Sequence, residues 1–296
     1  MRYFALLLAC MVFSTTAFAD PTVNKRSTGR SISSGGGGSS DIKAYNNQIG
    51  FQSISTNVNY TEVGNGVQTT AGTLDTESGP VHGQAFFVSA MNDVLLGNDY
   101  FKASYDQSVG MTNYVGGTLN PPSAYGSVTT TSSATLTNFG FRYGKGFPVQ
   151  GASMLTPYVE IGSHRWERGV NYGETYSHNY FGFGLLNQYS LGNSLVFSVD
   201  AMFGHTNGSA IAVTSSPPGV PAASQITGFS TALGDSTLYK VGVSLDYVLG
   251  AKIHVNAGFD YSAFSYGISA TQPSGLLEPD SRTNYTTVRI GLGFGF

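Results

Sequence analysis

Residues 289–296 read RIGLGFGF, and this stretch decides the fold class. Apolar side chains at the even positions 290 to 296 alternate with Arg289 and three glycines. Because successive side chains point to opposite faces of a strand, the pattern predicts a β-strand with one apolar face and one sparsely polar face. A chain built from such strands needs an apolar medium on one side of its sheet and a polar interior on the other.

The same alternation recurs from about residue 50, where we count ten runs separated by turn-forming residues. The connections between the runs differ systematically in length. Short turns are predicted near 92–99, 145–153, 190–194 and 248–252, and longer segments near 64–80, 110–133, 169–178, 205–236 and 267–282. Every second connection is short, which is typical of an antiparallel up-and-down barrel with both termini at the short-turn end.

The composition favours a membrane barrel over a soluble one. Charged residues make up 10% of the chain, against about 25% in a typical soluble domain. After the first 20 residues there is no apolar run of the roughly 20 residues that a spanning helix needs. The predicted fold is therefore an all-β transmembrane up-and-down barrel, closed because open strand edges are costly in lipid. We expect ten strands, although eight or twelve also fit the pattern.

If the apolar face meets lipid, the opposite face lines the lumen and its charges should neutralise one another. Aromatic residues at the ends of the runs, such as Tyr239 and Tyr247, fit interfacial girdles. The predicted lumen charge network consists of Arg142, Glu160, Asp200, Lys240, Asp246, Asp260 and Arg289.

The first residues carry a separate signal. Residues 1–19 combine a basic start, an apolar run that includes the single Cys10, and a small-x-small site ending at Ala19. They predict a cleaved secretory signal peptide. Residues 20–49 are rich in Gly and Ser and predict a flexible periplasmic leader. The barrel is expected over 50–296.

The last strand resembles the C-terminal recognition signal of bacterial outer-membrane barrels. Arg289, Gly291, Phe294 and Phe296 occupy the pattern polar-x-Gly-x-x-aromatic-x-aromatic. The resemblance implies residence in the outer membrane, contact with its lipid and lipopolysaccharide, and recognition by the barrel-assembly machinery. These four residues would then serve insertion rather than activity.

Size and strand number are also similar to those of the omptin proteases, whose family chemistry implies an aspartate pair and an Asp-His pair at the extracellular mouth. Asp106 and His205 are the available candidates, yet the sequence has no Asp-x-Asp or Asp-x-His in the corresponding loops. We therefore predict no catalytic residues and no enzyme. The other histidines, His82, His164, His178 and His254, are isolated in sequence, so no metal or cofactor site is predicted.

These observations favour a small barrel that acts in envelope structure or surface interaction through its loops. A net charge of -3 gives no basic excess for nucleic acid. The alternative is a narrow channel for small solutes, gated by residues 20–49, and an omptin-like protease is the weakest hypothesis. The predicted loop 206–236 is the best candidate for a surface ligand because it carries several apolar residues: Ile211, Val213, Val220, Ile226 and Phe229.

Overall fold

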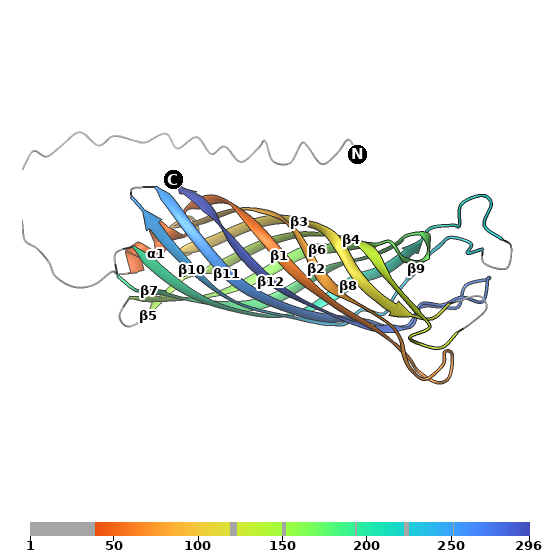
Figure 1. Ribbon diagram of the computed structural model, residues 1–296. Helices are drawn as coiled ribbons and strands as arrows, with labels where there is room; N and C mark the ends of the chain where they lie inside the picture. Colours follow the sequence, from red (N-terminus) through yellow and green to blue (C-terminus); the bar gives the residue numbers. More distant parts are fainter. Residues whose placement is uncertain (1–38, 119–122, 150–151, 193, 222–224, 251) are drawn as a thin grey trace, which may run out of the picture. The chain divides into compact units, whose positions relative to one another are not determined.

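The computed structural model describes residues 39–118, 123–149, 152–192, 194–221, 225–250 and 252–296. They form one small helix, one 3₁₀ turn and twelve strands, most of which lie in a single sheet wall (Figure 1). The elements are α1 Ser39–Tyr45, β1 Gln48–Gly64, β2 Gly72–Asn92, β3 Asp99–Gly116, β4 Val128–Lys145, β5 Phe147–Val149, β6 Ser153–Arg168, η1 Val170–Tyr172, β7 Glu174–Ser190, β8 Leu195–Val213, β9 Phe229–Ala232, β10 Thr237–Leu249, β11 Ile253–Tyr266 and β12 Asp280–Gly295.

The sheet closes into an antiparallel barrel. Each long strand pairs with the next long strand in the chain, and β12 returns to β1 with Phe294 opposite Ile49. Two of the twelve strands are short additions, since β5 pairs with β6 and β9 pairs with the last four residues of β8. Ten strands therefore make the wall, and the predicted ten-stranded up-and-down barrel is confirmed.

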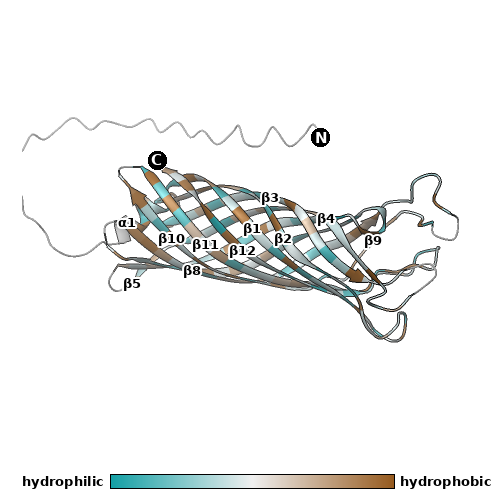
Figure 2. Cartoon of the chain, in the orientation of Figure 1, coloured by the Kyte–Doolittle hydropathy of each residue, from teal (hydrophilic) through white to brown (hydrophobic). Residues whose placement is uncertain are grey.

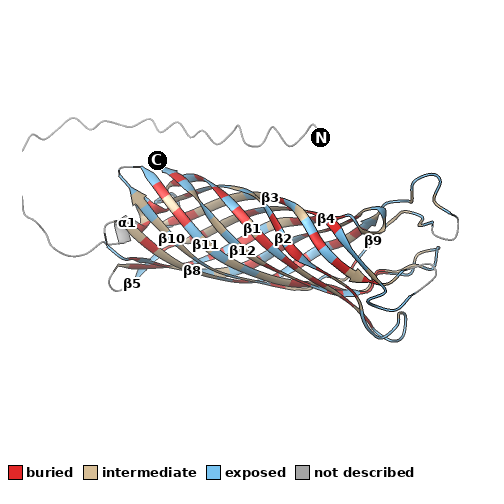
Figure 3. Ribbon diagram, in the orientation of Figure 1, coloured by how far each residue is buried: buried red, intermediate tan, exposed pale blue. Residues whose placement is uncertain are grey.

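Alternating exposure along the strands places the two faces as the sequence predicts. On β12, Ile290 and Leu292 are 61% and 59% exposed on the outer face. Gly293, the residue after Leu292, lies on the opposite face and is buried. Figures 2 and 3 show the same alternation of hydropathy and burial along the wall. The exposed apolar side chains form a belt around the barrel near the end that carries α1 and the C-terminus. None of the helices in the described ranges has the length and hydropathy to cross a bilayer.

The strands continue well beyond this belt. The ten long strands have 13 to 21 residues each, whereas about 9–11 residues suffice for a strand to cross a bilayer. Above the belt the outer face turns polar, with Asn57, Asn59 and Thr61 on β1 and Ser177 and Asn179 on β7. We call this part the upper barrel. The upper barrel extends from the apolar belt to the long loops.

Several predicted loop boundaries are wrong, because the strands extend into the upper barrel. Segments 110–133 and 205–236 were expected to be loops, but β3 continues to Gly116, β4 begins at Val128 and β8 continues to Val213. Ile211, expected in a surface loop, is fully buried in β8. Thr, Ser, Asn and Gly occupy both faces of these strand ends, so no hydrophobic period marks them as strands.

The N-terminal region is only partly described. Strand β1 begins at Gln48, close to the predicted start of the barrel at residue 50, and α1 occupies part of the predicted leader 20–49. The predicted signal peptide 1–19 and its cleavage site lie outside the described residues. The helix lies at the short-turn end of the barrel, beside the C-terminus, where the Phe296 amide donates to the Asn47 carbonyl at 3.2 Å (Figure 1).

Candidate functional site

Helix α1 fills the short-turn mouth of the barrel. Ile42 is fully buried, and the Asn46 side chain exchanges two hydrogen bonds with Gln188 on β7, at 2.7 and 3.2 Å. On the rim, Lys43 forms a 2.6 Å ion pair with Asp93 in the turn after β2. An apolar anchor inside and an ion pair at the edge therefore hold α1 as a plug.

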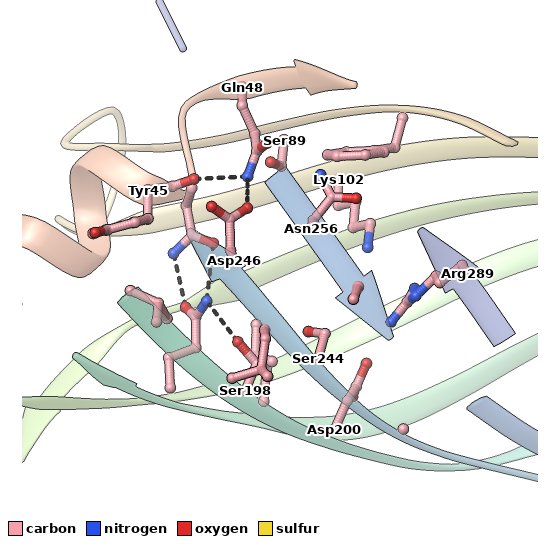
Figure 4. A pocket seen from close by; sticks show the side chains of 18 of the residues that line it. Tyr45, Gln48, Ser89, Lys102, Ser198, Asp200, Ser244, Asp246, Asn256 and Arg289 are labelled. Atoms are coloured by element: carbon pink, nitrogen blue, oxygen red, sulfur yellow. Dashed lines mark hydrogen bonds between the residues drawn. The ribbon is translucent and has the colours of Figure 1, made fainter. Parts of the chain in front are cut away.

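A cavity of about 130 Å³ lies between this plug and the middle of the lumen (Figure 4). Gln48 donates to Asp246 at 2.8 Å, and the same carboxylate contacts His254 at 2.7 Å. Lys102 and Arg289 also line this cavity, to the right of these groups in Figure 4. Most of the side chains that line the cavity are polar, with apolar groups such as Leu186 and Val196 among them.

The next level is an ion network that spans the lumen. Arg142 on β4 contacts both Glu160 on β6 and Asp200 on β8. From the far wall, Lys240 on β10 reaches the same Glu160 at 2.9 Å, and Tyr180 donates to Glu160 at 2.8 Å. Four of the seven predicted lumen charges thus meet in one cluster, because the pleat directs them inward at the same height.

The remaining predicted lumen charges lie apart from this cluster. Arg289 pairs with Asp260 at 3.1 Å on the neighbouring strand, and Asp246 lies lower, beside the plug. Sequence analysis missed Lys102, whose ammonium lies 5.5 Å from the Phe87 ring inside the lumen. The alternation of β3 identifies Lys102 as inward, but the run around it was too weak to assign a face.

Above the network lies an aromatic and histidine layer. His164 and His178 sit opposite each other on β6 and β7 with ring centroids 5.1 Å apart, so they are not isolated in space as they are in sequence. His164 contacts Asn138 at 2.7 Å, and His178 contacts Tyr266 at 2.8 Å. These contacts hold the rings in a packed layer.

The two candidates for omptin-like chemistry are separated by the barrel wall. Asp106 accepts a 2.8 Å hydrogen bond from Asn138 inside the lumen. His205 is exposed on the outer face of β8, where its ring lies 6.4 Å from Phe181. Across the described ranges, no group of three or more His, Cys, Asp or Glu side chains is arranged to hold a metal ion.

The upper barrel holds a second charged cluster that sequence analysis did not find. Arg168, at the end of β6, is fully buried, and its guanidinium lies 2.8 Å from Glu77 and 3.3 Å from Glu174. Two further carboxylates lie 3.6 Å away, and a fifth accepts hydrogen bonds from Tyr60 and Tyr176. We call this the mouth cluster: Glu62, Asp75, Glu77, Arg168, Glu174 and Glu278.

A cavity of about 390 Å³ opens directly above the mouth cluster. Four of the five carboxylates line it, together with apolar side chains of the long loops. Burial and then the neighbouring Glu62 raise the pKa of the Asp75 carboxyl, and burial likewise raises that of Glu278 in the loop before β12. The strand ends that carry the cluster lie above the apolar belt, with Arg165 and Glu167 paired on the outer face at the same height.

Comparison with known proteins identifies solved structures with a similar fold. No family model matches the chain, and no curated protein matches its sequence. The outer membrane protease OmpT from Escherichia coli aligns with 84% of this chain and 95% of its own, at 11% identity and a TM-score of 0.51. The chain has the fold of an outer-membrane β-barrel.

Two further barrels align more distantly. They are the translocator domain of autotransporter NalP from Neisseria meningitidis, at 12% identity over 87% of this chain and 91% of its own with a TM-score of 0.38, and the Pseudomonas putida toluene transporter TodX, at 9% identity over 84% and 90% with a TM-score of 0.32. At such identities the likeness concerns the fold alone, so activity has to be inferred from this chain's own residues.

Proposed function

We propose that this protein is an outer-membrane barrel that binds a ligand at its extracellular end and does not conduct solutes. The observation that carries the proposal is the contrast between a lumen crossed by side chains, with cavities of about 130 and 220 Å³ between them, and a larger cavity at the mouth. Helix α1, the Arg142 network and the His164 layer cross the lumen at three successive heights. The cavity of about 390 Å³ lies instead among the long loops.

The proposed orientation in the membrane follows from the outer surface. The apolar belt fits the hydrocarbon layer with its lipid and lipopolysaccharide, and the short turns with α1 face the periplasm. The upper barrel and its loops then stand in water outside the cell. Arg289, Gly291, Phe294 and Phe296 are proposed as the signal read by the barrel-assembly machinery, because they lie on the strand that closes the barrel.

Planar-bilayer recording of the refolded protein, residues 20–296, tests the closed lumen. Ten strands give an interior only slightly wider than the eight-stranded case, which side chains fill. We expect no unitary currents above the bilayer baseline. Stable single-channel steps from the intact protein would overturn the proposal.

A gated channel is the second candidate, and the placement of α1 favours it. The ion pair that joins the plug to the rim is accessible to water, because the Asp93 side chain is 67% exposed. Deleting residues 20–47 should produce currents if α1 is the gate. If the deletion variant is also silent, the Arg142 network and the His164 layer close the lumen without α1, and the channel hypothesis fails.

A further inference from the structure

The mouth cluster contains more acidic side chains than the protein provides basic partners for. Four carboxyl groups lie within 4 Å of the buried Arg168 guanidinium, and a fifth, that of Glu278, accepts hydrogen bonds from two tyrosines. No lysine, arginine or histidine is among the described residues that line the cavity. Carboxylates removed from water need a cation or hydrogen-bond donors. The acidic side chains of the cluster lack a basic partner on the side that faces the cavity.

Asp75 provides an independent sign of a missing partner. The residue is only 7% exposed, and it lines the cavity. Its Oδ2 lies 3.6 Å from Arg168, whereas its Oδ1 is buried and has no hydrogen-bond partner. A buried acceptor without a donor costs about 1–3 kcal/mol or more when charged. A ligand that carries an N–H donor would satisfy Oδ1.

Part of the wall above the carboxyl groups is apolar. Leu74 and Leu276 line the cavity, as do Val213, Ile226 and Phe229, which come from three different segments. A simple metal ion would make no use of these side chains, and the described carboxylates do not have a metal-binding arrangement. The cavity therefore combines an anionic floor with apolar sides.

We propose that the mouth cavity binds a small organic cation, a protonated amine or guanidinium attached to an apolar group, with the charge against Asp75 and Glu278. This inference rests on the proposed binding function and names the class of its ligand. Charge-assisted hydrogen bonds from the cation satisfy the floor, and burial of the apolar group against Leu276 and Phe229 adds hydrophobic stabilisation.

Titration calorimetry with benzylamine tests the ligand class, with benzyl alcohol as its neutral counterpart and ethylammonium as a cation without the ring. The refolded protein, residues 20–296, is used in detergent. Trp166, the single tryptophan of the chain, lies 5.0 Å from the Arg168 guanidinium, so its fluorescence locates the binding event. We expect benzylamine to bind most tightly and to change the fluorescence.

Asp75→Asn and Glu278→Gln should each weaken benzylamine binding about tenfold or more, as expected for lost hydrogen bonds to a charged group. Glu167→Gln is the matched control, because Glu167 lies at the same height on the outer face and pairs with Arg165 at 2.7 Å. Its affinity for benzylamine should equal that of the wild type. Unboiled gel mobility identifies any variant that has not folded.

Other outcomes separate this inference from the proposed function. Benzyl alcohol binding as tightly as benzylamine, or unchanged affinity in both acidic variants, would overturn the cationic class and leave a binding cavity. Binding of Ca²⁺ alone, with no benzylamine signal, would overturn it in favour of a metal. Single-channel currents from the intact protein would refute the closed barrel, whatever the cavity binds.

Discussion

Replacing Arg168 by methionine should destabilise the upper barrel far more than the same change at Arg165. The two arginines lie three residues apart on β6 and point to opposite faces. Arg168 is fully buried, whereas the Arg165 side chain is 54% exposed and pairs only with Glu167. Arg165→Met therefore controls for residue type, strand and height in the barrel.

The expected magnitude follows from the contacts of Arg168. Its guanidinium lies within 4 Å of four carboxylates, at 2.8, 3.3, 3.6 and 3.6 Å, and 4.6 Å from the Tyr60 ring. Removing one partner of a buried ion pair costs about 3–5 kcal/mol, because the other charges stay buried and unpaired. An exposed pair such as Arg165 with Glu167 contributes about 0–1 kcal/mol.

The loss of unfolding free energy in the Arg168→Met variant should also depend on pH. Burial raises the pKa of Asp75 to about 9 and that of Glu174 to about 7, so the folded state binds these protons more tightly than the unfolded state does. Their stabilising contribution is complete below the ordinary carboxyl pKa and is lost as the pH rises through the raised values. Without Arg168 these pKa values rise further. The variant should therefore lose more stability at pH 8 than at pH 5.

Urea unfolding of the refolded proteins, followed by Trp166 fluorescence, measures these free energies at the end of the barrel that carries the cluster. Unboiled gel mobility reports separately on the closed wall. Equal unfolding free energies for Arg168→Met and Arg165→Met at pH 8 would refute the reasoning, and so would a deficit that shrinks as the pH rises.

Two further changes test the lower barrel. Phe296→Ala should reduce the amount of protein in outer-membrane fractions. Phe259→Ala, which changes another exposed phenylalanine of the belt, should not. Normal levels of the Phe296 variant would contradict an assembly role. Lys240→Met removes a 2.9 Å ion pair from the buried Glu160 and should lower the unfolding free energy by about 1–3 kcal/mol, against no change for the exposed Lys252→Met. A Lys240 variant as stable as the Lys252 variant would show that Arg142 alone compensates Glu160.

The wall and the lumen charges follow from the sequence because a strand has a strict period of two. Once Arg142 and Glu160 are assigned to the polar faces of their runs, both must point inward, and the register between β4 and β6 places them opposite each other. Distances across the lumen do not follow in this way. Lys240 reaches Glu160 from β10, three places away along the wall, and only closure of the barrel brings these two strands face to face.

The mouth cluster could not be found by the same reasoning, because its members lie within or beside segments that were predicted to be loops. Glu77 and Arg168 lie in strand ends where Ser, Thr and Gly leave no hydrophobic period. One signal was nevertheless present in the sequence. Acidic residues at 62, 75, 77, 174 and 278 all border connections of the longer kind, which an up-and-down barrel gathers at one end.

The position of the mouth cluster also fits its chemistry. In the Arg142 network, two cations contact two carboxylates. In the upper barrel, four carboxyl groups lie within 4 Å of Arg168 and Glu278 lies beside them, so the cost of burying this acidic excess must be offset elsewhere in the fold. A closed wall, hydrogen-bonded on both edges of every long strand, provides stability that an open sheet would lack. Local violations of polar pairing occur at functional sites, and the acidic excess of the mouth cluster faces a cavity among the long loops.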